Sequence, residues 1–174
     1  MKEEQRNVKR GCLGCLGIIV LIALIITAFT MCSNNKESDM PTTTEIYQIG
    51  SDAPQPNTSQ MVDYIIDQGR NFAEKGTKGD ATFALQWILD NKSNLFKDNA
   101  TMEAAMYYGT VMEKYYEGEQ LESNPRYYYL YNIGMDTVQA VKYVYRGAET
   151  PESSATKENL SQIEKSIQEI NNLK

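Results

Sequence analysis

The stretch NPRYYYLYNIGMDTVQAVKYVYRG (Asn124–Gly147) decides the fold. Asparagine is a preferred N-cap residue, and proline suits the first helical position because its missing N–H would have no partner there. Glycine is a common residue just beyond a helix end. We therefore expect a helix from Pro125 to Arg146, about 33 Å long at 1.5 Å per residue.

Apolar side chains cover most of the circumference of this helix. Two stripes with helical spacing leave only a narrow polar strip. The main stripe contains Tyr127, Leu130, Tyr131, Gly134, Val138, Val141 and Tyr145, the second contains Tyr129, Ile133, Ala140 and Val144, and the polar strip contains Asn132, Asp136, Gln139 and Lys142. A helix that is apolar on several sides needs several neighbours. The sequence thus places residues 125–146 at the centre of a helical domain.

Four further helices are predicted, at about 60–75, 81–91, 100–117 and 156–173, each with an apolar face. The expected caps of the first three are Ser59, Asp80, and Asp98 or Asn99. The last helix has a narrow apolar seam of two heptads, which favours docking on the same chain over a coiled coil with a partner. The predicted fold class is all-α, with a compact bundle of four to five helices in residues 60–174.

A second stretch determines where this domain is held. Residues 11–32, GCLGCLGIIVLIALIITAFTMC, contain no charged side chain, and as a helix they can span the roughly 30 Å hydrocarbon layer of a bilayer. The tail 1–10 is basic, so the positive-inside rule places the N-terminus in the cytoplasm and the C-terminal domain outside. The sequence predicts a single-pass transmembrane signal anchor, followed by a flexible polar linker over residues 33–59.

All three cysteines lie in or beside this apolar segment. Cys32 is the candidate acylated residue if the chain is a bacterial lipoprotein, although Met31 replaces the small residue that normally precedes that cysteine. Cys12 and Cys15 lie at the cytoplasmic edge, where they are more typical of small residues in a membrane helix; reversible S-acylation is the alternative and makes both candidate lipidation sites. Removal by signal peptidase after Thr30 is a third alternative, which threonine at the cut disfavours. The retained anchor is preferred, and the outer domain must rely on its hydrophobic core because it has no disulfide.

The residue inventory argues against catalysis. The chain has no histidine, which removes Ser-His and Cys-His nucleophile pairs and most zinc sites. The remaining candidates are the carboxylates Glu113, Glu117 and Glu119, as in a glycosidase-like hydrolase. Glu113 and Glu117 lie four residues apart on the polar side of their helix, a pattern more typical of a solvated acidic face. We therefore expect no enzyme activity, no metal and no cofactor.

The charge distribution argues against nucleic-acid partners. The chain has a net charge of −6. Residues 1–32 contain four basic and two acidic side chains, so the remaining residues carry −8. Such an acidic domain repels phosphate backbones and anionic lipid surfaces.

Tyrosine is the unusual residue of this sequence, because ten of the twelve lie between Tyr107 and Tyr145. Helical spacing assigns most of these rings to the core. Tyr128 and Tyr143 instead fall near the polar strip of their helix, and Tyr107 lies at the edge of its apolar seam. These three are the candidate binding residues, because exposed tyrosine offers a rigid aromatic body and a polar tip.

These features favour a membrane-anchored, extracytoplasmic protein-interaction domain without enzymatic activity, in a bacterial cell-envelope or prophage-type surface protein. The expected partner is therefore another protein at the cell surface. The first alternative is a tyrosine-lined receptor for a small molecule, peptide or glycan. The second alternative is a carboxylate-based hydrolase.

Overall fold

The computed structural model describes residues 53–173, except the side chains of Glu119 and Gln120, and this part is all-helical with no strand. It contains six α-helices and one short 3₁₀-helix: α3 (Ser59–Ala73), α4 (Lys78–Asn91), η1 (Lys92–Asn94), α5 (Asn99–Tyr116), α6 (Glu119–Ser123), α7 (Pro125–Tyr145) and α8 (Ser154–Asn172). The basic tail 1–10, the anchor 11–32 with its three cysteines, and linker residues 33–52 lie outside the described residues. No helix within residues 53–173 combines the length and hydropathy needed to cross a bilayer.

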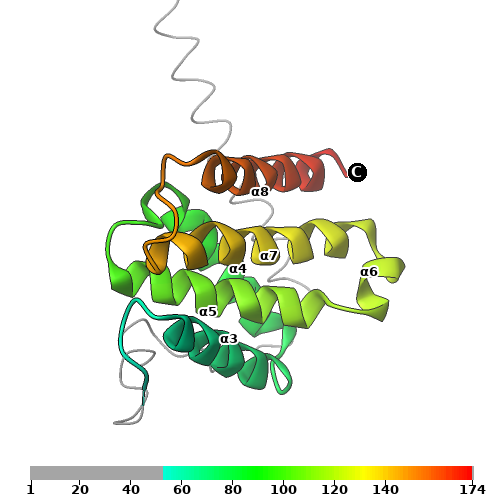
Figure 1. The fold of residues 1–174 in the computed structure, drawn as a ribbon. Coiled ribbons are helices and arrows are strands. Elements are labelled where there is room, and N and C mark those ends of the chain that lie inside the picture. Colours follow the sequence, from blue (N-terminus) through cyan, green and yellow to red (C-terminus); the bar gives the residue numbers. More distant parts are fainter. Residues whose placement is uncertain (1–52, 174) are drawn as a thin grey trace, which may run out of the picture. The chain divides into compact units, whose positions relative to one another are not determined.

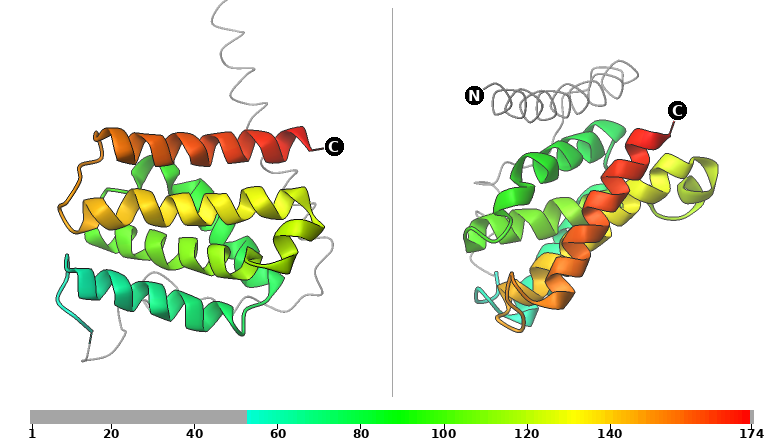
Figure 2. Two further views of the ribbon diagram at one scale, coloured as in Figure 1. Left: turned by 45° about the vertical axis from the view of Figure 1, so that its right-hand side comes forward. Right: turned by 90° about the horizontal axis from the view of Figure 1, so that it is seen from above.

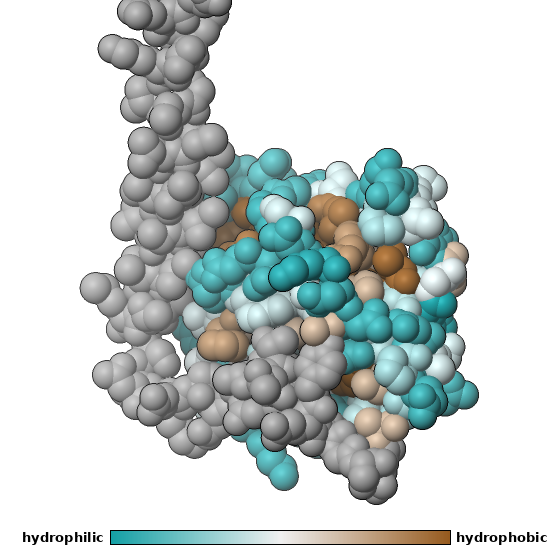
Figure 3. All heavy atoms as spheres, turned by 90° about the vertical axis from the view of Figure 1, so that its left-hand side faces the viewer, coloured by the Kyte–Doolittle hydropathy of each residue, from teal (hydrophilic) through white to brown (hydrophobic). Residues whose placement is uncertain are grey.

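All five helices expected from the sequence are present, and the short α6 is an additional one. Four of them lie side by side in the order α3, α5, α7, α8, and α4 lies behind this layer (Figures 1 and 2). The largest helix contact is between α5 and α7, and α8 packs on α7. The end of the domain at the left of Figure 1 is mainly hydrophilic, with separate small apolar spots (Figure 3).

Helices α5 and α7 together form the centre of the bundle. Helix α5 contacts α3, α4 and α7, and every residue from Met102 to Met112 is buried. Helix α7 keeps one outer face that none of the described helices covers (Figure 1). Helix α7 contacts α4, α5, α6 and α8. The prediction that residues 125–146 have neighbours on several sides is therefore confirmed, and α5 shares the central position.

Two glycines let α5 and α7 touch backbone to backbone. A Cβ atom added to Gly134 would lie 2.6 Å from the carbonyl oxygen of Gly109, and one added to Gly109 would lie 2.8 Å from the carbonyl oxygen of Gly134. Real Cβ atoms do not approach backbone atoms this closely. The helix crossing at the core of the domain therefore requires glycine on both sides.

The caps show why α3 and α4 begin earlier than expected. Thr77, not Asp80, caps α4: the Thr77 hydroxyl accepts from the N–H of Asp80, and the Asp80 carboxylate accepts from the N–H of Thr77 at 2.6 Å. This reciprocal capping box moves the helix start three residues upstream. Thr58, not Ser59, caps α3. The expected Asp98 and Asn124 caps, and the left-handed Gly147 after α7, are confirmed.

The last helix docks on its own chain, as its narrow seam predicts. Helix α8 packs on α7, with Ile163 and Ile170 buried beside the small polar residues Thr156 and Ser166. Asp136, which the sequence places on the polar strip of α7, is in fact only 7% exposed. Burial, assisted by the negative charge of Glu158 on α8, raises the pKa of Asp136 to about 6. The α7–α8 contact therefore has a carboxylate whose charged form is disfavoured.

We predict that Gly134→Ala destabilises the domain by about 1–3 kcal/mol, because the new methyl group forces the α5 and α7 backbones apart. Helix propensity alone would favour alanine over glycine by about 1 kcal/mol, so the two effects have opposite signs. Urea unfolding followed by circular dichroism measures the difference, with Asn132→Ala on the same helix as control. A stabilised Gly134→Ala variant would contradict the close crossing.

We predict that Asp136→Asn stabilises the domain at pH 7 by about 1–2 kcal/mol, because it removes a carboxylate that is costly to ionise in the fold. The pKa of Asp136 is higher in the folded chain than the ordinary aspartate value of 3.8, so its contribution to stability improves as pH falls through about 6 toward 4. The free energy of unfolding, measured from pH 4.5 to 7.5, should therefore change less with pH in the variant than in the wild type. Asp67→Asn, at an exposed position of α3, is the control; an equal effect there would refute the assignment.

Candidate functional site

The outer face of α7 carries both exposed candidate tyrosines. Tyr128 is 52% exposed and Tyr143 is 39% exposed. With Asn132, Met135, Gln139, Lys142 and Arg146 they lie within about 60° of one line along the helix at 100° per residue; we call these seven residues the outer α7 stripe. At 1.5 Å per residue the two tyrosines lie about 22 Å apart along the helix axis. Helices α5 and α8 flank this stripe without covering it (Figure 1).

Neighbouring side chains hold each tyrosine of the stripe. The Nζ of Lys142 lies 5.0 Å, and the Cζ of Arg146 lies 4.9 Å, from the centre of the Tyr143 ring. Arg146 is itself tied to α3, because its Nη1 donates to the Ser59 hydroxyl at 3.1 Å. The Tyr128 ring meets that of Tyr129 edge to face, with centroids 5.5 Å apart. Cation–π and edge-to-face contacts of this kind restrict ring motion and so reduce the entropy lost on binding.

Tyr107 does not belong to this surface. It is only 4% exposed, and its ring lies 6.2 Å from that of Phe72 on α3 and 5.7 Å from that of Tyr108. Burial, together with the charges of Tyr108 and Asp80, raises the pKa of the Tyr107 hydroxyl. The prediction that Tyr107 is a surface binding residue is therefore wrong for this fold, because α3 packs over the edge of the α5 seam.

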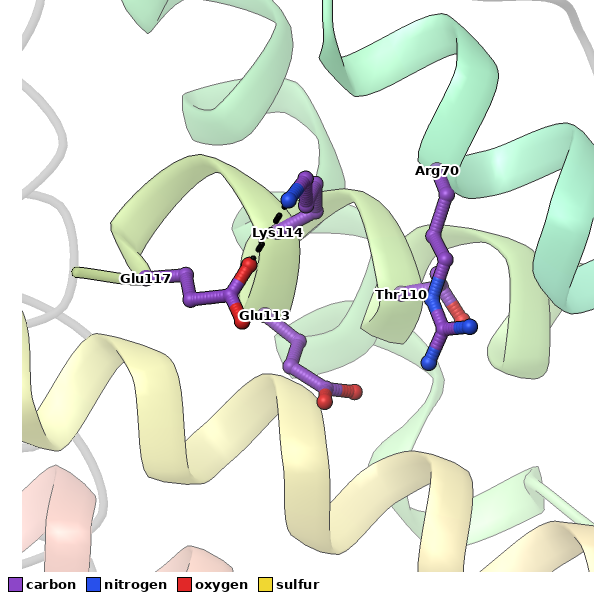
Figure 4. A pocket seen from close by; sticks show the side chains of 5 residues that line it. All are labelled: Arg70, Thr110, Glu113, Lys114 and Glu117. Atoms are coloured by element: carbon purple, nitrogen blue, oxygen red, sulfur yellow. Dashed lines mark hydrogen bonds and ion pairs between the residues drawn. The ribbon is translucent and has the colours of Figure 1, made fainter.

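A charged groove lies over α5 on the side of α3. It encloses about 220 Å³ and is lined by Arg70 of α3 and by Thr110, Glu113, Lys114 and Glu117 of α5. In Figure 4 the side chains of Arg70 and Glu113 extend from different helices toward the same space. Lys114 and Glu117 are paired across 2.8 Å, and the Thr110 hydroxyl donates to the Met106 carbonyl at 2.8 Å.

Glu113 is more enclosed than the sequence predicts. It is half-buried rather than part of a fully solvated acidic face. Burial raises the pKa of Glu113, Glu117 raises it further, and the cations of Arg70 and Lys142 oppose the shift. Glu117 is exposed, and the Glu119 side chain lies outside the described part. The two described carboxylates thus share one groove but lie in different environments.

A buried polar pair joins α5 and α7 at the end of the domain where α5 begins and α7 ends. The Tyr145 hydroxyl of α7 donates to Oε1 of Glu103 on α5, and Glu103 is only 3% exposed. The backbone of Asn57, which has a left-handed φ of 59°, hydrogen-bonds to the same hydroxyl. The contact therefore fixes the chain just before α3 to the core. Sequence reasoning assigned Tyr145 to the core but did not identify Glu103, although this carboxylate interrupts an otherwise apolar or small stretch.

Within residues 53–173, no three potential ligands from Asp, Glu, Cys or His are grouped so that they could hold a metal ion. In comparisons with known proteins, no protein family, no curated protein and no solved structure matches the chain. The surface features that can indicate a function are therefore the outer α7 stripe and the charged groove.

We predict that Tyr145→Phe lowers the free energy of unfolding by about 1.5–3 kcal/mol, because it removes the hydrogen-bond donor of a buried carboxylate. Tyr143→Phe, which removes an exposed hydroxyl from the same helix, should change stability by less than about 0.5 kcal/mol. Thermal and urea unfolding of both variants measure the contrast. Equal losses in the two variants would show that the Glu103–Tyr145 contact is not required.

Proposed function

We propose that residues 59–173 form a protein-interaction domain that binds its partner through the outer α7 stripe. The observation that carries this proposal is the pair of exposed tyrosines, Tyr128 and Tyr143, on one uncovered face of a central helix. Tyrosine is enriched among the residues that dominate binding energy at protein interfaces. Neighbouring side chains already restrict both rings, so little side-chain conformational entropy would be lost when a partner binds.

The charges of the stripe indicate the kind of partner surface that fits. Its ionic residues are Lys142 and Arg146, both basic, although residues 33–174 together carry −8. A partner that offers an apolar patch for the tyrosines and carboxylates for the two cations would be complementary to it. Electrostatic attraction of this kind mainly increases the association rate and the specificity of docking.

We further propose that residues 11–32 anchor this domain to a membrane, with residues 1–10 in the cytoplasm and the domain outside. The charge-free length of the segment and the basic tail support a signal anchor, and an acylated Cys32 would give the same tethered arrangement. A bacterial cell-envelope or prophage-type surface protein fits this layout. On a tether, the outer α7 stripe would meet partners in the same or a facing membrane at raised effective concentration.

A non-enzymatic role is proposed because the chain has no histidine and residues 33–174 have no cysteine. The alternative of a tyrosine-lined receptor finds less support, since the lining of the groove over α5 contains no tyrosine. The alternative of a carboxylate-based hydrolase would have to use Glu113 and Glu117, which come from successive turns of one helix. The outer α7 stripe thus supports protein contact better than either alternative.

We predict that replacing both Tyr128 and Tyr143 with alanine reduces partner capture at least tenfold, because the variant loses both aromatic anchors of the stripe. The measurement is chemical cross-linking of the full-length chain in native membranes, followed by affinity purification and quantitative mass spectrometry. Tyr64→Ala, at a half-buried tyrosine of α3, is the matched control and should retain the partners.

Partners that persist unchanged in the double variant would exclude the outer α7 stripe as the interface. The same preparation also tests the anchor independently. The full-length chain should sediment with membranes in high salt and be released by detergent. Recovery in the soluble fraction with residues 1–32 intact would refute the anchor without bearing on the stripe.

A further inference from the structure

The charged groove over α5 provides hydrogen-bonding groups of both kinds around one small space. The donors are the guanidinium of Arg70 and the remaining N–H groups of the Lys114 ammonium, which already binds Glu117. The acceptors are the carboxylate of Glu113 and the Thr110 hydroxyl oxygen, whose own O–H donates to the Met106 carbonyl. Arg70 comes from α3 and the others from α5, so the groove exists only because these helices pack together (Figure 4).

Arg70 and Glu113, which extend toward this space from different helices, are not paired with each other (Figure 4). Among residues 53–173, neither Arg70 nor Glu113 has an ion-pair partner within 4 Å. The half-buried Glu113 carboxylate has lost part of its hydration, and hydrogen bonds from a bound donor would replace it. The guanidinium of Arg70 is a planar fork that matches the geometry of a carboxylate.

The charge balance of the groove selects against simple ions. Arg70 and Lys114 offset Glu113 and Glu117, so the four ionic groups that line it have no net charge. A lone cation beside Glu113 would be repelled by Arg70 and by Lys142, the cations whose fields reach that carboxylate. A lone anion beside Arg70 would face two carboxylates. A ligand that carries both charges can satisfy both sides at once.

We propose that this groove binds a small zwitterion, a free amino acid or a dipeptide, with its carboxylate on Arg70 and its ammonium group on Glu113. The volume of about 220 Å³ equals about seven water molecules at roughly 30 Å³ each, which suits a ligand of amino-acid to dipeptide size. The groove does not include Tyr128 or Tyr143. A test of ligand binding in the groove is therefore independent of a test of the protein-contact function.

The experiment titrates the purified full-length chain in detergent micelles with three probes and follows side-chain resonances by NMR. The probes are glycylglycine, which carries both charges, sodium acetate, which offers only the anion, and ethylammonium chloride, which offers only the cation. Glycylglycine should bind saturably with a Kd on the order of 10 mM, as expected for so small a ligand. Each single-charge probe should bind at least tenfold more weakly.

Arg70→Gln and Glu113→Gln should each weaken glycylglycine binding about tenfold or more, because each removes one charge-assisted contact. Asp63→Asn on α3 and Lys165→Gln on α8 alter exposed charges outside the groove and should leave binding unchanged. Unfolding curves of all four variants report whether the fold is retained. The absence of saturable glycylglycine binding up to about 50 mM, equal binding of acetate or ethylammonium, or unchanged binding in both groove variants would overturn the proposal.

Discussion

The direct contact between the backbones of α5 and α7 at Gly109 and Gly134 sets the geometry of the domain. Close helix approach maximises dispersion contacts along the crossing, and it leaves no room for even a methyl group on either side. It also brings the backbone N–H of Glu113 to 2.7 Å from the position of an added Gly134 Cβ atom. This approach places the backbone of Glu113 directly against α7. One packing constraint thereby shapes both the core and the charged groove.

The arrangement of helices as a layer explains which residues are free to act. Helix α5 is enclosed by α3, α4 and α7, so its tyrosines Tyr107 and Tyr108 are used in ring packing. Helix α7 is flanked by α5 and α8 but retains an outer face with Tyr128 and Tyr143. The tyrosines of these two helices therefore divide into a core group and a surface group. The division follows the neighbours of each helix rather than its own composition.

Three carboxylates are buried or half-buried where helices meet, and each has different surroundings. Glu103 accepts a hydrogen bond from the Tyr145 hydroxyl, and this bond offsets the cost of its burial. Asp136 lies in the α7–α8 contact near Glu158, where burial disfavours its charge. Glu113 is intermediate, since Arg70 and Lys142 only partly compensate for its lost hydration. Glu103 therefore makes a structural contact, and Asp136 makes stability depend on pH. Glu113 is the carboxylate that we propose binds a ligand.

The sequence by itself determined the all-α class, the five long helices, and the exposure of Tyr128 and Tyr143, because these depend on local capping and on the 3.6-residue period of one helix. It also predicts the anchor, which lies outside the described residues. Only the tertiary structure decided that Tyr107 and Asp136 are buried, that Glu103 meets Tyr145, and that Arg70 shares a groove with Glu113. The period of a helix shows which residues share a face, but it does not show which other helix covers that face. That choice depends on the close approach at Gly109 and Gly134, a contact between residues distant in sequence.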